Sequence, residues 1–208
     1  MSSILKVDEI QDTSGNNIIN ENANTVTIGK SGDIVNVVGT LQSNGSDVPT
    51  VAGGITEADQ WRLTTDLTGS ANPITSNLER VDNTGFGYIG TGMSVSSGIW
   101  TFPSTGIWLV RTNANISNGS TSSRYNRVDI FTTTDNSTYT EVSNAFASIS
   151  YVSSFTYQSM NNEIFFDVTD TSNCKVKFRF DVDNGNTRLM GDTTLNKTNF
   201  VFIRLGDT

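Results

Sequence analysis

Residues 175–182 read KVKFRFDV, in which apolar and charged side chains alternate without a break. Successive side chains of a β-strand point to opposite faces of a sheet, so this alternation predicts a half-buried strand. Its four apolar side chains then face a core, and its charged side chains face water. Residues 162–168 carry a similar pattern. We expect these two strands to be hydrogen-bonded neighbours.

The last strand is of a different kind. Residues 200–205 read FVFIRL, which is apolar on both faces. Burial of both faces requires either a central strand covered by a second layer or a subunit interface. The pattern is compatible with each of these, and with both together.

Residues 99–110, IWTFPSTGIWLV, bring large apolar side chains to one corner of the fold. Pro103 and Gly106 interrupt the chain between two apolar strands. Trp100, Phe102 and Trp108 flank the interruption. Aromatic side chains of this kind bury large areas, and they pack in cores more often than they serve as ligand platforms.

The composition predicts an all-β protein. Asn, Thr, Ser and Gly are abundant, and the 18 glycines suit turns between short strands. Charged residues make up 16%, and residues that favour long helices are scarce. No apolar run approaches the roughly 20 residues that span a bilayer, so we expect no membrane insertion.

The charge and the missing residue types narrow the chemistry. The net charge is −8 and the 13 basic residues are scattered, so we expect no nucleic acid partner. The chain has no histidine and one cysteine, Cys174, which excludes Ser-His-Asp sites, Cys-His sites and His/Cys zinc sites. Residues 181–186 resemble half of a calcium loop, but the downstream glutamate is absent and a hairpin turn explains them. We therefore predict a non-enzymatic protein without cofactor or metal.

The segment from Gly98 to Ile116 resembles the globular-head domain of complement and the related tumour necrosis factor (TNF)-like jelly rolls. In that family an F-x-x-P-x-x-G-x-Y stretch links two core strands, and Phe102, Pro103, Gly106 and Trp108 follow it loosely. The ending KTNFVFIRL, residues 197–205, is similar to the family's final strand, which lies near a three-fold axis.

This resemblance covers residues 57–208 and implies a trimeric jelly-roll β-sandwich. It assigns the aromatic corner and the last strand to the core or to the trimer interface. The residues so assigned are Trp100, Phe102, Trp108, Phe200, Phe202 and Ile203.

Residues 1–45 read differently from the rest. Very short strand-like pieces alternate with glycine turns roughly ten residues apart, in a segment with too little apolar surface to fold alone. The segment is either one unit of an intertwined β-prism or a tail that orders on binding. Residues 46–56 are rich in Pro, Gly and Ala and are typical of a linker. The apolar residues assigned to attachment are Ile4, Leu5, Val7, Ile10, Ile18 and Ile19.

The opening string SILKVDEIQD at residues 3–12, followed by SGNNIIN at 14–20 and VTIG at 26–29, resembles the start of many short virion proteins of marine bacteriophages. That resemblance implies a homotrimer fixed to a virus particle by its N-terminus, which contacts other virion proteins. The N-terminus lacks the basic start and apolar stretch of a signal peptide. We therefore expect synthesis in the host cytoplasm and a final location in the virion.

Three functions fit this plan. The first is a phage tail fibre or spike whose jelly roll projects toward a host-surface glycan or protein. The second is a capsid decoration or head-fibre protein that stabilises the particle. The third is a glycan-cleaving enzyme that uses two carboxylates, but the available acids lie at turns and on solvent-facing sides of strands. Those acids are Asp167, Asp170, Asp181 and Asp183.

Receptor recognition by a projecting jelly roll would use its loops. Residues 115–127 and 183–194 contain amide, carboxylate and guanidinium groups near an aromatic ring, which together could hold a sugar. A plain solvated loop is the alternative for each. The candidate receptor residues are Asn118, Tyr125, Asp183, Asn186 and Arg188.

Overall fold

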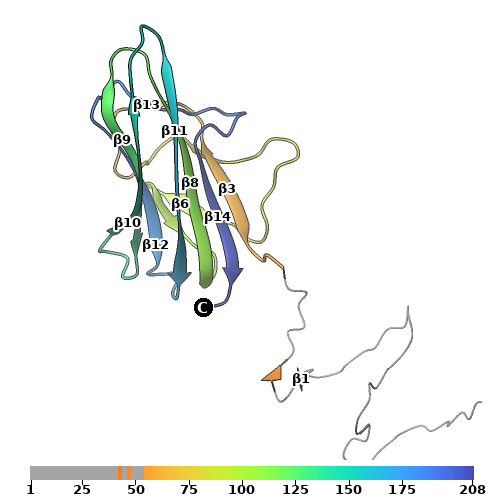
Figure 1. The fold of residues 1–208 in the computed structure, drawn as a ribbon. Coiled ribbons are helices and arrows are strands. Elements are labelled where there is room, and N and C mark those ends of the chain that lie inside the picture. Colours follow the sequence, from red (N-terminus) through yellow and green to blue (C-terminus); the bar gives the residue numbers. More distant parts are fainter. Residues whose placement is uncertain (1–41, 44–45, 48–53) are drawn as a thin grey trace, which may run out of the picture. The chain divides into compact units, whose positions relative to one another are not determined.

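The computed structural model describes residues 42–43, 46–47 and 54–208 (Figure 1). The chain divides into two units, Met1–Gly53 and Gly54–Thr208. The division falls inside the predicted linker, although residues 46–47 form a strand. In the first unit β1 (Gln42–Ser43) pairs antiparallel with β2 (Ser46–Asp47). The predicted attachment residues lie outside the described part of the chain: Ile4, Leu5, Val7, Ile10, Ile18 and Ile19.

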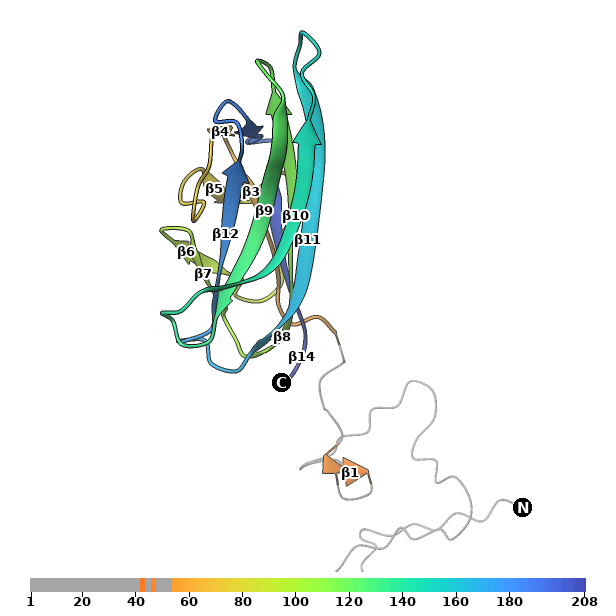
Figure 2. The ribbon, with the colours of Figure 1, turned by 60° about the vertical axis from the view of Figure 1, so that its left-hand side comes forward.

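The second unit is the predicted all-β jelly-roll sandwich of two antiparallel sheets (Figure 2). One sheet has five strands in the order β10-β9-β12-β7-β6. Their bounds are β6 (Ser94–Ser96), β7 (Ile99–Thr101), β9 (Ser123–Thr133), β10 (Thr140–Ile149) and β12 (Lys175–Val182).

The other sheet has seven strands. Six follow the order β4-β13-β8-β14-β3-β5, and β11 pairs along the whole remaining edge of β8. The described residues contain no helix of the length and apolarity that a bilayer crossing requires. The strand bounds are β3 (Ala58–Leu63), β4 (Leu67–Thr68), β5 (Leu78–Arg80), β8 (Gly106–Asn118), β11 (Thr156–Val168), β13 (Arg188–Leu189) and β14 (Asn199–Gly206).

The core between the sheets is built around Trp100 of β7. Its ring lies 5.1 Å from that of Trp61 in a T-shaped arrangement, and 5.0 Å from that of Phe202. Phe178 and Phe200 complete the contacts. Such tilted and edge-on pairs are the favoured geometries of buried aromatic rings. Five of the residues assigned from the sequence to the core or interface are buried here: Trp100, Phe102, Trp108, Phe200 and Phe202.

Strand β12 has the predicted faces but not the predicted neighbour. Val176, Phe178 and Phe180 are buried, as the alternation indicates. Its hydrogen-bonded neighbours are β9 and β7, however, so the expected pairing with residues 162–168 is wrong. Those residues belong to β11, which joins the opposite sheet beside β8. Alternation determines which side of a strand is buried, and it carries no information about which strand lies next to it.

The final strand, β14, is central in its sheet, between β8 and β3. Phe200 and Phe202 point into the core, whereas Val201 and Ile203 lie on the opposite face and are half-buried. The central-strand interpretation therefore accounts for one apolar face of β14. The other face, with Val201 and Ile203, points away from the core.

Candidate functional site

The loops β8–β9, β10–β11 and β12–β13 gather at one end of the sandwich, at the top of Figure 1. The chain enters the domain at the other end, beside its C-terminus. There the Arg204 amide donates to the Glu57 carbonyl at 2.9 Å, and the Arg204 guanidinium donates to the Thr56 hydroxyl at 3.3 Å. The three loops are therefore remote from the point where the N-terminal segment is attached.

A hollow of about 190 Å³ opens among these loops. Four separate segments contribute to it, because the hairpin turns of both sheets converge at this end. Its lining combines hydroxyl, amide and guanidinium groups with one aromatic ring. The lining residues are Thr68, Gly119, Ser120, Phe155, Asn186 and Arg188, and we call this set the loop hollow.

Phe155 forms the aromatic wall of the loop hollow. Its ring stacks on that of Tyr157 with centroids 6.4 Å apart, and the Arg188 guanidinium carbon lies 5.3 Å from its centroid. Gly119 packs so closely that a Cβ atom there would come within 2.7 Å of the ring. The ring is 47% exposed despite these contacts. A guanidinium over an aromatic face is favourable, so Arg188 helps to hold Phe155 in place.

Two of the candidate receptor residues, Asn186 and Arg188, line the loop hollow, and the other three have structural contacts. Asn118 is fully buried; its Oδ1 accepts the Ser120 amide at 2.9 Å, and its Nδ2 donates to the Thr187 hydroxyl at 3.1 Å. The Tyr125 carbonyl accepts the backbone amide of Asp183 at 3.0 Å. Asn118 thus shapes the β8–β9 turn from below the surface.

Asp183 is held by Arg124. The guanidinium donates to the carboxylate from Nε at 3.0 Å and from Nη2 at 2.9 Å. The hydrogen bond from Arg124 lowers the pKa of Asp183, and the same bond raises the pKa of Arg124. Because both carboxylate oxygens accept from the guanidinium, Asp183 is ionised and has its hydrogen bonds made at the end of the sandwich that carries the three loops.

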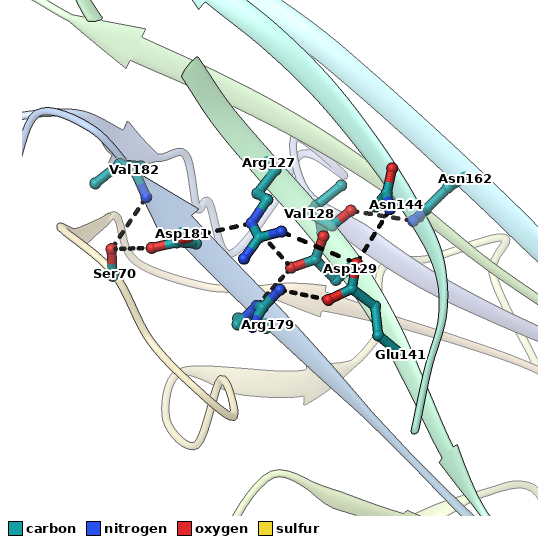
Figure 3. A network of polar contacts seen from close by, with 10 residues as sticks. All are labelled: Ser70, Arg127, Val128, Asp129, Glu141, Asn144, Asn162, Arg179, Asp181 and Val182. Atoms are coloured by element: carbon teal, nitrogen blue, oxygen red, sulfur yellow. Dashed lines mark hydrogen bonds and ion pairs between the residues drawn. The ribbon is translucent and has the colours of Figure 1, made fainter. Parts of the chain in front are cut away.

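The five-stranded sheet carries a charge network on the side away from Val128 and Ile130 (Figure 3). Arg179 contacts the Asp129 carboxylate and donates to Glu141 at 2.7 Å. Arg127 bridges Asp129 at 3.5 Å and Asp181 at 3.1 Å. The Asp129 side chain is fully buried, and its Oδ1 has no hydrogen-bond partner among the described residues. Burial raises the pKa of Asp129, and the two arginines act against that rise.

Three of the four acids considered for catalysis, Asp170, Asp181 and Asp183, make structural contacts. Asp181 accepts from Arg127 and Ser70. Asp170 accepts the Ser172 amide at 2.7 Å and caps the turn before β12. None of the four acids lines the loop hollow. The described residues also hold no group of three His, Cys, Asp or Glu side chains arranged to bind a metal ion.

No protein-family model and no curated protein matches this sequence. Solved structures do share its fold. Eiger TNF from S. frugiperda superposes with a TM-score of 0.56 at 12% identity, covering 74% of this chain and 96% of its own. Murine APRIL superposes with a TM-score of 0.51 at 11% identity, covering 72% and 98%. The fold is a TNF-like jelly roll.

The outer face of the seven-stranded sheet points away from the core between the two sheets. Paired residues of neighbouring strands lie side by side on that face, so its rows can be read from the register. One row is apolar and runs from Phe165 through Leu109 and Ile203 to Ala58. Phe165 is 71% exposed, the highest value of any large apolar residue described. We call this row the apolar row.

The next row of the same face contains an ion pair. Glu163 accepts from the Arg111 guanidinium at 2.8 Å, and Val201 follows on β14. Asn161 and Asn113 form the row after that. The face therefore grades from apolar, near the C-terminal end, to polar toward the loops.

The edge of the jelly roll beside this face also exposes two apolar side chains. Strand β10 ends the five-stranded sheet and lies next to β11 at one side of the sandwich (Figure 2). On it, Val142 and Phe146 are 45% and 59% exposed. One chain thus carries both the apolar row and, at Val142 and Phe146 of β10, an apolar edge.

Sequence reasoning missed two residues of the loop hollow, Thr68 and Phe155. Gly119 and Ser120 lie in the candidate receptor loop 115–127, although they were not among the candidate receptor residues. The loop around Phe155 did carry a signal, because residues 151–157 read YVSSFTY with three aromatic residues in a polar setting between two strands. No local pattern joins Thr68 to Phe155, because only the folded topology brings them together.

Proposed function

We propose that this chain is a phage virion appendage of the tail-fibre or spike type, a homotrimer fixed to the particle through its N-terminal segment. Its TNF-like jelly roll projects and presents the loop end to a host-surface glycan or protein. The observation that carries the proposal is the apolar row on the open face of the seven-stranded sheet, together with the apolar edge at β10.

Association of like chains follows from where these surfaces lie. Exposed contiguous apolar surface on a soluble protein marks an interaction site. The face of one copy and the β10 edge of another differ, so their contact is heterologous, and repeating it gives either a closed ring or an open filament. The TNF-like fold supports a closed ring of three, since the TNF-like jelly rolls that residues 57–208 resemble have their final strand near a three-fold axis.

The polarity of the domain supports a projecting role. The chain enters beside the C-terminus, and the loop hollow lies at the far end. A domain tethered through the residues before Gly54 then turns its loops away from the tether. The resemblance of residues 3–29 to phage virion proteins supports a virus particle as the structure to which it is tethered.

We propose no catalytic role for the chain. Asp181 and Asp183 are held by arginines, and Asp170 caps a turn. Glycoside hydrolysis uses two carboxyl groups that flank the bond to be cleaved. The polar groups of the loop hollow are instead uncharged or cationic, which suits binding without cleavage.

Deletion of residues 1–45 tests the anchoring assignment. We expect the truncated chain to stay folded, because residues 54–208 form a unit with its own core. We also expect it to be missing from purified particles that incorporate the full chain. Incorporation of the truncated chain would contradict the assignment.

Cryo-electron microscopy of the particle tests the location. Density for trimers projecting from the tail is the expected result. Density spread over the capsid, with the loops buried against other virion proteins, would replace the fibre assignment by the capsid-decoration alternative.

A further inference from the structure

We propose that the loop hollow binds one pyranose ring of a surface polysaccharide. This inference rests on the proposed host-contact function and names its ligand class and its residues. Phe155 supplies the surface on which the ring packs, and Arg188, Asn186 and Ser120 supply the hydrogen bonds.

The aromatic wall fits a sugar because one side of a pyranose ring presents mainly C–H groups. Such a side packs on an aromatic face, whereas the hydroxyl groups at its rim need polar partners. Phe155 is 47% exposed inside the hollow, and Tyr157, Gly119 and Arg188 fix its position. A ring held in this way loses little conformational freedom when a ligand packs on it.

The polar groups around Phe155 have hydrogen-bonding capacity to spare. Among the described residues the Arg188 guanidinium has one ion pair, at 3.8 Å from Asp66, and donates no hydrogen bond. The Ser120 hydroxyl donates to Asn118 Oδ1 at 3.2 Å, which leaves its own lone pairs to accept. The exposed amide of Asn186 offers both a donor and an acceptor. Sugar hydroxyls, which donate and accept at once, match this mixture.

The size and charge of the hollow favour a sugar over other partners. Its volume of about 190 Å³ is below the roughly 300–1,000 Å³ of pockets that enclose drug-sized ligands, so it suits one ring of a longer chain. The protein carries a net charge of −8, which opposes a nucleic acid. Arg188 can serve a hydroxyl or a carboxylate of the sugar, and the experiment separates the two.

The test uses saturation-transfer NMR on the full-length chain. The probes are neutral hexoses, deoxyhexoses, N-acetylhexosamines and hexuronates, each as the methyl glycoside. We expect transfer to the ring C–H protons of at least one class. We also expect Phe155→Ala and Arg188→Ala each to weaken binding by about tenfold or more. The matched control is Phe86→Ala, because Phe86 is a phenylalanine with 56% exposure outside the loop hollow.

A hexuronate preference that Arg188→Ala abolishes assigns Arg188 to a carboxylate, and a neutral-sugar preference assigns it to hydroxyls. No transfer to any class, or transfer unchanged in both variants, overturns the proposal. Thermal unfolding of each variant identifies losses caused by misfolding. Light scattering on the same samples separates this inference from the proposed trimer, because one protomer supplies every residue of the hollow. A monomer that binds sugar upholds the inference and contradicts the trimer.

Discussion

Trp100 contacts four other aromatic rings in the middle of the sandwich, and it is 1% exposed. Truncating it leaves a cavity that the rigid sheets on either side cannot close. We therefore expect Trp100→Ala to lower the free energy of unfolding by about 3–5 kcal/mol, measured by chemical denaturation. Phe86→Ala, at an exposed position, should change it by at most about 0.5 kcal/mol. Equal effects of the two substitutions would contradict this description of the core.

Asp135 organises the β9–β10 turn. Its Oδ1 accepts the Thr133 hydroxyl at 2.7 Å and the amides of Ser137 and Thr138 at 2.9 and 2.7 Å. The hydrogen bond from Thr133, followed by the two amides, holds the pKa of Asp135 far below its ordinary value. The stability that ionised Asp135 contributes is therefore fully present above the ordinary pKa of an aspartate and is lost as the pH falls below it.

Asp135→Asn removes that contribution. The variant should melt at a lower temperature than the wild-type protein at pH 7, and the gap should narrow below about pH 4. Melting curves recorded across this range by circular dichroism test the prediction. A gap that is constant with pH would mean that the charge of Asp135 contributes nothing.

At the scale of elements, the charge network joins β9, β10 and β12 across the five-stranded sheet (Figure 3). Asp129 in its centre is fully buried, so it depends on Arg179 and Arg127 for its charge. Removing one partner of a buried ion pair costs about 3–5 kcal/mol. Arg179→Leu should therefore lower the free energy of unfolding by that amount at pH 7. Arg124→Leu breaks a pair whose arginine is 82% exposed, so it should lower the free energy of unfolding far less.

The effect of Arg179→Leu should shrink as the pH falls. Burial already raises the pKa of Asp129. A raised pKa means that the folded state binds a proton at Asp129 more tightly than the unfolded state does. The stability that comes from protonated Asp129 is therefore present at low pH and is lost as the pH rises through the raised pKa. Without Arg179 the buried carboxylate is less compensated and the loss is larger. A destabilisation that grows at low pH would contradict the assignment of Asp129 as a buried, ionised partner.

The strands show which features of the fold a local sequence pattern can predict. Alternation in residues 175–182 predicted the correct buried face. The two-sided apolar pattern of residues 200–205 was compatible with a central strand or a subunit interface, and β14 is central in its sheet. The pairing of residues 162–168 was wrong because the jelly roll sends consecutive strands β11 and β12 into different sheets. That crossover is decided by contacts between distant segments, which local periodicity does not contain.

The candidate site also contains residues that the sequence predicted and residues that only the fold brings together. Asn186 and Arg188 were predicted from their residue types in one loop, and both line the loop hollow. Asn118 has the same polar character, yet the fold buries it beneath the turn. Phe155 reaches the hollow from another hairpin, next to Gly119. Composition therefore indicates which loops are polar, and only the topology determines which of their side chains meet.

At the scale of the whole molecule, the open sheet face accounts for the apolar residues that the core does not use. Phe165→Asp places a charge at the β11 end of the apolar row, on its most exposed residue. Phe165 is 71% exposed in the single chain, so its replacement should leave the fold and its melting intact while separating the copies. Ser96→Asp adds the same charge on β6, at the opposite edge of the five-stranded sheet from β10, and should leave assembly unchanged.

The native mass of the full chain in solution tests the central claim most directly. Analytical ultracentrifugation of the wild-type protein should give three times the 22.5 kDa of one chain, and Phe165→Asp should shift it to a single chain. A wild-type mass of one chain, at concentrations where the protein is folded, would contradict the account, because the apolar row and the β10 edge would then be exposed without a partner.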